Sequence, residues 1–317
     1  MSGYILRRVL LMVPLLFGIS VISYAVITFA PGDPARLLAD PEQVTAEQLA
    51  SARERLGLDD PLPIQYVKMM RGLMTGDLRS FRTSQPVIEM IGERLPTTLA
   101  LSELALVFGV GGGILIGIIQ SLRPYSRVDD AGTFVSLFGF AVPDFWLAIM
   151  LILLFAVRLE WLPASGFRPA GTSGWNLVEM APHLVLPTIE LGTGLMASMA
   201  RYTRSAMLEA LSQDYVRTAR AKGLRERVVV ARHALRNSLL PVITLLGFYV
   251  PILFGGAVVV ETIFAIPGVG RLALDSVFAR DYPVILSINL MGAVAVLAGN
   301  LLADVGYAAV DPRIRYK

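Results

Sequence analysis

Residues 9–30 read VLLMVPLLFGISVISYAVITFA, an unbroken run of 22 residues without a charge. A helix that rises 1.5 Å per residue needs about 20 apolar residues to cross the roughly 30 Å hydrocarbon core of a bilayer. A secretory signal is the competing interpretation, because Arg7 and Arg8 precede the run. The apolar region of such a signal is only about 7–15 residues long. The length therefore favours a transmembrane helix.

Five further apolar stretches have the same character, at residues 98–122, 131–157, 183–200, 239–260 and 283–308. The whole chain of 317 residues is 55% hydrophobic and only 17% charged. Soluble domains carry about 25% charged residues, so this chain has too few charges to cover a water-soluble protein of its size. The sequence predicts an all-α polytopic membrane protein with six transmembrane helices.

The distribution of Lys and Arg predicts that both termini face the cytoplasm. Short cytoplasmic loops hold more of these residues than short outer loops, whereas long loops cross the membrane largely regardless of charge. With the N-terminus inside, the inner segments hold sixteen Lys and Arg and the short outer loops hold four. The other eight lie in the long first loop, residues 31–97, beside ten acidic residues.

The first loop carries helix signals of its own. Thr45 and Gln48 have the spacing of a capping box, and Gly57 ahead of Pro61 and Pro63 is typical of a helix end. We expect helices near residues 46–56 and 64–74 on the outer face. Two roles stay open for them: a lid that rigidifies the outer mouth, or a docking surface for an extracellular partner.

Residue types that support catalysis or metal binding are scarce. Cysteine is absent, and the two histidines, His183 and His233, are fifty residues apart. The sequence contains no phosphate-binding loop, metal-ligand pair or nucleophile motif. We therefore expect no catalytic residue, cofactor site or metal site in this chain, no ATP hydrolysis and no nucleic-acid partner.

Gly109, Gly113 and Gly117 recur every four residues and so share one face of the second predicted span. Small residues at this spacing let two helices approach closely in a bilayer. A phosphate-binding loop is the alternative, but the Lys that such a loop requires does not follow these glycines. The sequence predicts a helix-packing stripe.

Four residues within the spans are candidates for the translocation pathway: Pro143, Asp144, Glu103 and Glu190. Proline removes a backbone hydrogen bond and kinks a helix, and a carboxylate in the bilayer usually faces a bundle interior or a watered cavity. Each carboxylate could instead pair with a polar group on a neighbouring helix, so a pathway role and a structural role both stay open. Asp144, which adjoins the expected kink, is the strongest candidate.

The most informative segment is the inner loop between the fourth and fifth spans, at about residues 205–238. Four apolar residues recur there at helical spacing: Leu208, Leu211, Tyr215 and Ala219. Gly223 is placed as the C-cap of that helix, and a second helix would follow from about residue 225. An amphipathic helix here could lie on anionic lipid or contact a protein, and composition alone does not decide between them.

A resemblance to a known family favours the protein contact. The sequences YVRTARAKG at residues 215–223, HALRN at 233–237 and LP at 240–241 resemble the EAA loop of type I ABC importer permeases, in the form that dipeptide/oligopeptide permeases use. Further motifs agree in order along the chain: PGDP at 31–34, GDL at 76–78, LPxTL at 95–99, Pro143 with FW at 145–146, LPxSG at 162–166, ETIF at 261–264, PG at 267–268 with Gly270, RDYP at 280–283 and DPR at 311–313. As a set these motifs are highly specific.

The resemblance implies a permease subunit of an ATP-driven importer that forms half of the pathway for di- or oligopeptides. A coupling helix at about residues 212–222 would then sit in a groove of a cytoplasmic ATPase. The residues implied in this coupling loop are Asp214, Tyr215, Arg217, Thr218, Ala219, Arg220, Ala221, Lys222 and Gly223. Small side chains at Thr218, Ala219 and Ala221 would let the helix sit deep.

The same resemblance implies the partners and the location. Two ABC ATPase subunits would bind ATP and magnesium, a second homologous permease would complete a heterodimer, and an extracytoplasmic solute-binding protein would deliver the substrate. The location implied is the bacterial or archaeal cytoplasmic (inner) membrane. The chain would divide into a first helix with a large outer loop (1–94), a five-helix core (95–308) and a cytoplasmic tail (309–317).

One departure and several alternatives bear on the assignment. The general EAA consensus opens with an acidic residue and alanine, where this chain has Arg217 and Thr218. That departure fits the peptide subfamily, whose relatives also carry nickel chelates, glutathione or oligosaccharides. A secondary transporter without an ATPase would show inverted repeats and paired broken helices, and a membrane hydrolase would need a catalytic pair. The sequence has no convincing repeat and no such pair.

Overall fold

Helices build most of the described chain. In the computed structural model the described residues are 2–35, 45–169, 171–172, 174–236, 238 and 257–310. Within these residues the only β pairing is an isolated antiparallel bridge between Arg79 and Pro86. The predicted all-α fold is therefore confirmed. The chain divides into two units.

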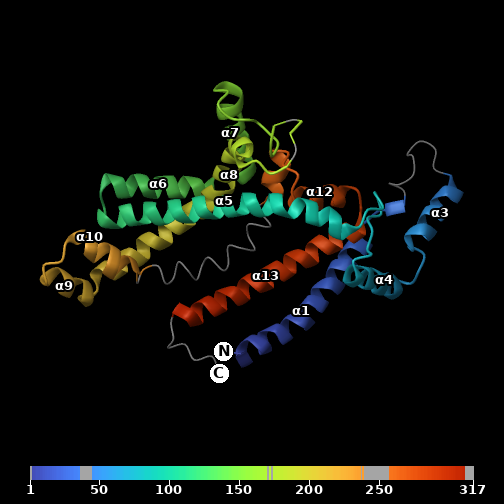
Figure 1. Cartoon of the computed structure of the whole chain (residues 1–317), viewed down its shortest axis with the longest axis horizontal. Helices are drawn as coiled ribbons and strands as arrows, with labels where there is room; N and C mark the ends of the chain where they lie inside the picture. The colour runs from blue at the N-terminus through green and yellow to red at the C-terminus, as the bar shows by residue number, and fades with distance from the viewer. Residues whose placement is uncertain are drawn as a thin grey trace. The chain divides into compact units, whose positions relative to one another are not determined.

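The first unit comprises the described residues of Met1–Thr98 and Pro267–Ala298. Its helices are α1 (Ser2–Phe29), α3 (Ala46–Leu56), α4 (Leu62–Thr75), the first part of α5 (Val87–Leu122), α12 (Val269–Phe278) and most of α13 (Tyr282–Val310) (Figure 1). One buried apolar cluster consists of Tyr24, Ile27, Met69, Tyr282 and Leu286. Through these side chains α1, α4 and α13 pack together.

The caps of the first loop form as the sequence predicts. The hydroxyl of Thr45 accepts a hydrogen bond from the N–H of Gln48 at 3.2 Å, and the side-chain oxygen of Gln48 accepts one from the N–H of Thr45 at 3.2 Å. Gly57 ends α3 with a φ of +65°. The second predicted helix is α4, which begins two residues before the predicted start because a proline fits the first turn, where its missing N–H is not needed.

A buried carboxylate links the first loop to the turn before α13. Asp281 accepts hydrogen bonds from the hydroxyl of Ser80 and from the N–H of Phe81, the latter at 2.9 Å. The oxygen of Ser80 in turn accepts from the N–H groups of Arg82 and Thr83, at 3.2 Å and 3.0 Å. This link joins segments about 200 residues apart in the sequence.

Asp281→Ala is expected to lower the stability of the first unit by about 1–3 kcal/mol, because the hydroxyl of Ser80 and the N–H of Phe81 would stay buried without an acceptor. Thermal unfolding of the purified protein in detergent measures the loss. Asp275→Ala is the matched control, since Asp275 is exposed and lies 4.0 Å from Arg271. We expect the control to stay within about 0.5 kcal/mol of the parent, and equal losses would contradict the assigned role of Asp281.

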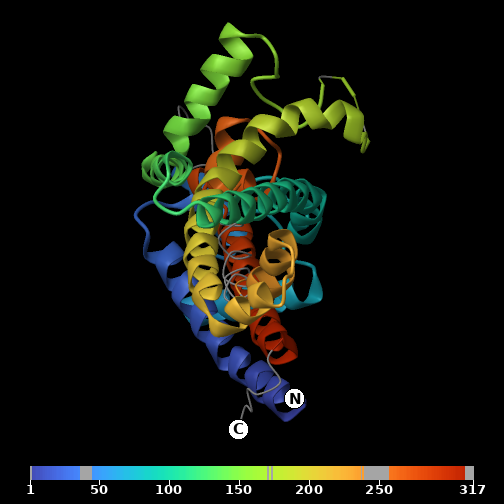
Figure 2. The ribbon, with the colours of Figure 1, turned by 90° about the vertical axis from the view of Figure 1, so that its left-hand side faces the viewer.

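The second unit comprises Leu99–Ile266 and Gly299–Arg315. Besides the rest of α5 and the end of α13, its helices are α6 (Arg127–Ala141), α7 (Asp144–Leu151), the π-helix η1 (Ile152–Arg158), α8 (Leu177–Ser212), α9 (Asp214–Ala221), α10 (Glu226–Val228) and the π-helix η2 (Val229–Leu235). α8 packs against both α6 and α7. α9 and α10 extend from the C-terminal end of α8 (Figure 2).

The third predicted span, residues 131–157, is not one helix. α6 and the segment formed by α7 and η1 meet at 106° across Val142 and Pro143. Both residues are extended, with ψ angles of 128° and 135°. A proline disfavours the helical conformation of the residue before it and cannot donate a backbone hydrogen bond. The expected kink is therefore a complete break.

The glycine stripe of α5 packs directly on α8, as the sequence predicts. A Cβ atom added at Gly109 would lie 2.8 Å from the carbonyl oxygen of Gly192. One added at Gly117 would lie 2.6 Å from the carbonyl oxygen of Ala200. Such approaches leave no room for a side chain, so the two helix backbones touch along this stripe.

Three described helical segments are long and apolar enough to cross a membrane: Leu6–Phe29, Val87–Leu122 and Tyr282–Leu301. The bent pair of α6 with α7 and η1 would make a fourth. The predicted span at 183–200 lies within α8, whereas the one at 239–260 lies outside the described residues except for 257–260. The count of six spans, the orientation and the division at 94/95 stay predictions, and most of the tail at 309–317 lies outside the described residues.

Candidate functional site

The helix predicted at 212–222 forms as α9, which begins and ends inside those bounds. Val216 and Ala219 point inward and are buried against Val229 of η2 and Leu211 of α8. Tyr215 is 40% exposed. Leu211 and Ala219 of the predicted apolar stripe do face the interior. The prediction is wrong for Tyr215, because Val216 occupies the inward position instead.

Gly223 ends this segment as the sequence predicts. Its φ of +76° lies in the left-handed region that favours glycine. The N–H of Gly223 donates to the carbonyl of Arg220 at 2.9 Å, and the N–H of Leu224 donates to the carbonyl of Ala219 at 3.4 Å. This pair of bonds is the Schellman ending of a helix. A Cβ atom at Gly223 would meet no described atom within 4 Å, so conformation alone restricts this position.

An ion pair closes the turn that follows α9. Nη2 and Nε of Arg220 lie 2.7 Å and 3.2 Å from the two carboxylate oxygens of Glu226. The guanidinium lowers the pKa of Glu226 below its ordinary value of 4.5. The stabilisation is thus present above that value and is lost as the pH falls below it. Because both side chains are exposed, the pair orients the turn more than it stabilises the fold.

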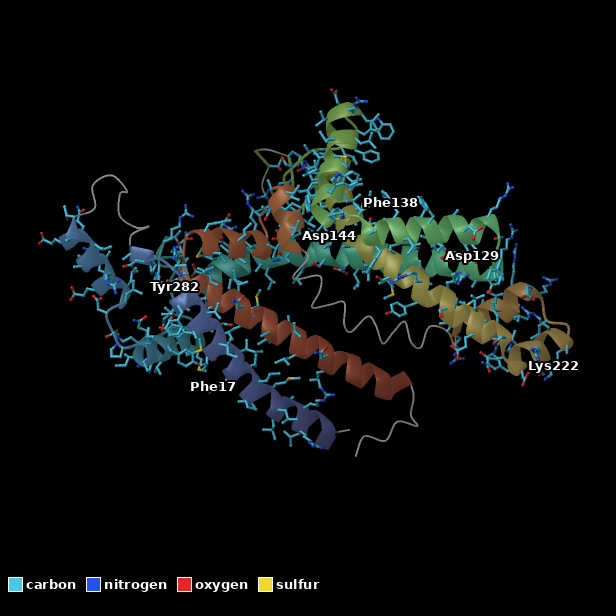
Figure 3. The ribbon with its side chains drawn as sticks, turned by 180° about the vertical axis from the view of Figure 1, so that it is seen from behind. Phe17, Asp129, Phe138, Asp144, Lys222 and Tyr282 are labelled. Atoms are coloured by element: carbon cyan, nitrogen blue, oxygen red, sulfur yellow. The ribbon has the colours of Figure 1, made fainter. Side chains whose placement is uncertain are left out.

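The predicted coupling residues lie together on one projecting segment, and Lys222 lies at its far end (Figure 3). All but one of them are exposed: Asp214, Tyr215, Arg217, Thr218, Arg220, Ala221, Lys222 and Gly223. The exception is Ala219, whose side chain faces the interior of this chain. The second predicted helix is present as α10 and η2, whereas Asn237 lies outside the described residues.

The four pathway candidates do not form one cluster. Glu190 is buried on α8, and one of its carboxylate oxygens has no hydrogen-bond partner among the described residues. Its carboxyl group interacts electrostatically with Asp144, which is exposed in this chain and starts α7 after Pro143. Glu103 is exposed on α5 and, in the described part of the chain, makes no hydrogen bond or ion pair with either acid.

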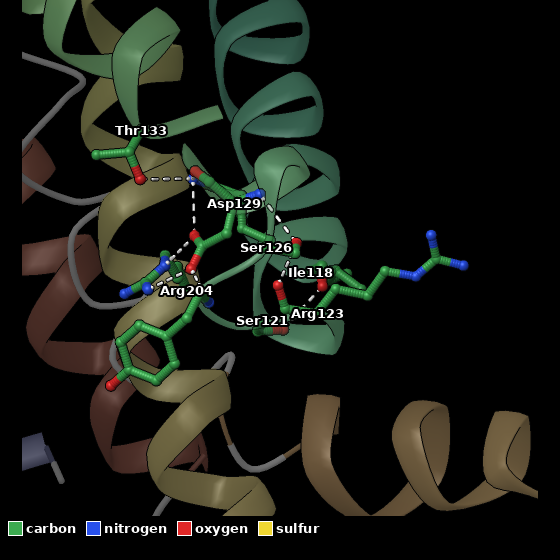
Figure 4. A network of polar contacts seen from close by, with 9 residues as sticks. Ile118, Ser121, Arg123, Ser126, Asp129, Thr133 and Arg204 are labelled. Atoms are coloured by element: carbon green, nitrogen blue, oxygen red, sulfur yellow. Dashed lines mark hydrogen bonds and ion pairs between the residues drawn. The ribbon is translucent and has the colours of Figure 1, made fainter. Parts of the chain in front are cut away.

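Sequence reasoning missed a buried polar network in the second unit. Asp129 at the start of α6 pairs with Arg204 of α8, 75 residues away (Figure 4). The two residues share no local motif. The only sequence signal is an aspartate in the first turn of a helix, which is equally typical of an exposed helix start.

Two family profiles together match almost the whole chain. The profile described as "Binding-protein-dependent transport system inner membrane component" matches residues 113–316. Its N-terminal companion, "Binding-prot-dependent transport system membrane comp, N-term", matches residues 1–102.

Curated relatives match this chain from end to end. The oligopeptide transport system permease protein AppB of Bacillus subtilis (strain 168) is 45% identical over 320 residues, with 100% of both chains covered. The dipeptide transport system permease protein DppB of Alkalihalophilus pseudofirmus is 40% identical, and the protein of that name in Escherichia coli (strain K12) is 38% identical, again over the full length of both chains.

A solved structure supports the fold. The crystal structure of an amino acid ABC transporter with histidines aligns with a TM-score of 0.52 at 16% identity, over 70% of this chain and 94% of that chain. The match of one profile to well over half of the chain, together with full-length relatives far above 30% identity, identifies the family. The chain belongs to the inner-membrane components of binding-protein-dependent transport systems, and it is an ABC importer permease.

Proposed function

We propose that this permease carries di- or oligopeptides across the cytoplasmic membrane of a bacterium or archaeon. The observation that carries the proposal is the full-length similarity to permeases that are named for oligopeptide and dipeptide transport. The chain would form half of the pathway and a homologous permease the other half. A solute-binding protein outside the membrane would deliver the peptide, and two ATPase subunits would bind ATP and magnesium.

We further propose that α9 is the element on which an ATPase subunit docks. Its outward face carries Tyr215, Thr218 and Lys222, which share one side of the helix because they are three or four residues apart. Ala219, which the sequence also suggested for this contact, is buried within the chain and would support the helix from behind. The exposed Tyr215 offers an amphipathic ring of the kind that anchors protein interfaces.

Cysteine protection tests this docking face, because the chain has no native cysteine. A maleimide is expected to modify Thr218→Cys in the isolated permease, and bound ATPase is expected to slow that modification at least about tenfold. Ala219→Cys should stay unreactive in both states, since its side chain is covered by Val229. Arg123→Cys, in the exposed turn before α6, is the control and should react equally in both states. Equal labelling of Thr218→Cys with and without the ATPase would refute the proposed face.

Peptide uptake tests the function itself. The complex purified from native membranes is expected to contain a second permease and ATPase subunits, and proteoliposomes should take up a labelled dipeptide only with ATP and the binding protein. A preference for a nickel chelate, glutathione or an oligosaccharide would reassign the substrate. Uptake by this chain without any ATPase would point to a secondary transporter instead.

The intramembrane residues Pro143, Asp144, Glu103 and Glu190 remain our candidates for the translocation pathway. Asp144 is the best placed, because it follows the break between α6 and α7 and its carboxylate is exposed in this chain. An exposed carboxylate in a bilayer needs water, a partner subunit or a polar cargo beside it. Glu190 would act only through Asp144, since its own side chain is buried.

A further inference from the structure

Asp129 and Arg204 form an ion pair whose carboxylate is enclosed within the second unit. The carboxylate of Asp129 is 3% exposed, and Nε and Nη2 of Arg204 donate to its two oxygens at 2.6 Å and 2.7 Å. The N–H of Tyr125 donates to the same carboxylate at 2.9 Å. Such a bidentate pair fixes both the distance and the relative orientation of the elements that carry it.

The pair belongs to a network that joins four segments (Figure 4). The side-chain N–H₂ of Gln120, at the end of α5, donates to the carbonyl of Asp129 and to the hydroxyl of Thr133, both at 3.2 Å. The hydroxyl of Ser126 accepts from the N–H of Asp129 at 3.4 Å. The end of α5, the turn, the start of α6 and the C-terminal part of α8 are thereby held as one body.

This network lies where α8 continues toward α9. Arg204 is about two turns before the end of α8, which runs without a break to Ser212. Met207 and Ala210 of that last stretch are buried with Ala234 of η2. η2 in turn packs on α9. From Arg204 to α9 each step is therefore a packed helical contact, except for the single extended residue Gln213.

Stability alone does not account for a buried ion pair. Removing two charges from water costs free energy that their attraction only partly restores, and apolar replacements are often as stable. What an apolar pair lacks is a defined orientation. The network thus specifies geometry: it fixes where α6 starts relative to the part of α8 that leads to α9.

We propose that Asp129 and Arg204 are positioning residues for transport, which make α6 follow any displacement of α9. This inference rests on the proposed docking of an ATPase subunit on α9. α6 packs along α8 and leads into the break at Val142 and Pro143, next to Asp144. A movement that the ATPase imposes on α9 then reaches the break between α6 and α7 through the fixed pair.

Arg204→Lys tests the proposal, because it keeps the charge and loses the bidentate geometry. In the reconstituted complex the variant is expected to assemble in normal amounts and to keep ATP hydrolysis within about twofold. Peptide uptake per ATP hydrolysed should fall about tenfold, within the range by which single residues change coupling between sites. Arg127→Lys, at the exposed first residue of α6, is the matched control, and its peptide uptake per ATP hydrolysed should equal that of the parent.

A second variant is used if Arg204→Lys does not assemble into a complex that can be purified. The double change Asp129→Leu with Arg204→Met removes both charges together, so no buried charge is left unpaired. It should assemble and hydrolyse ATP but transport peptide poorly. Normal uptake per ATP by either variant, or uptake and hydrolysis that fall only in proportion to the amount of complex, would overturn the positioning role. A parent complex that lacks an ATPase or transports no peptide would instead reject the proposed function.

Discussion

Gly113→Leu is expected to remove most of the folded permease from the membrane. A Cβ atom at Gly113 would lie 2.4 Å from the Cβ of Met199 and 2.7 Å from the carbonyl oxygen of Met196. These atoms belong to the backbone of α8 or adjoin it, so they cannot move aside as the end of a side chain can. Inserting a larger side chain into a close-packed site lowers the free energy of unfolding by about 1–3 kcal/mol. The loss at Gly113 should reach or exceed the upper end of that range, because the two helix backbones must move apart.

Gly111→Leu is the control for this prediction. Gly111 lies two residues earlier on α5, and a Cβ atom there would meet no described atom within 4 Å. Size-exclusion chromatography of fluorescently tagged protein in mild detergent should give a single sharp peak for Gly111→Leu. For Gly113→Leu it should give mostly aggregate. Similar profiles for the two variants would mean that the contact between α5 and α8 does not hold the second unit together.

The features predicted correctly are those that few neighbouring residues determine. The capping box of Thr45 and Gln48 needs only a spacing of three residues, and Gly223 needs only a helix before it. The membrane class follows from composition, because few charges cannot cover a soluble surface. The glycine stripe of α5 could likewise be predicted, because residues four apart in a helix lie on the same face.

The features that the sequence did not reveal depend on distant residues. The inward side of α9 is set by Val229, and the sequence pattern alone placed Tyr215 where Val216 belongs. The partner of Asp129 lies 75 residues away on another helix, and no spacing rule connects the two. At Pro143 the sequence predicted a kink, whereas the 106° angle also depends on how α6 and α7 pack against α8.

Gly223→Val is expected to separate ATP hydrolysis from peptide uptake while the membrane helices remain inserted. At a φ of +76° a β-branched side chain is strained, and such strain costs about 1–3 kcal/mol. The segment can relieve it by giving up the bonds to the carbonyls of Arg220 and Ala219. α9 would then lose its defined ending and the orientation in which Tyr215 and Thr218 face outward. Uptake per ATP hydrolysed should fall at least about fivefold, in line with that strain.

Gly223→Asn separates conformation from size in the same experiment. Asparagine adopts the left-handed conformation far more readily than valine does, and the space around Gly223 is open to either side chain. We therefore expect Gly223→Asn to keep most of the coupled uptake and Gly223→Val to lose it, at equal amounts of assembled complex. If asparagine and valine are equally harmful, a side chain of any kind blocks the partner, and the docked surface extends to Gly223 itself. If both variants keep normal uptake per ATP hydrolysed, the ending of α9 has no part in transport, because its left-handed conformation at Gly223 would have been disturbed without effect.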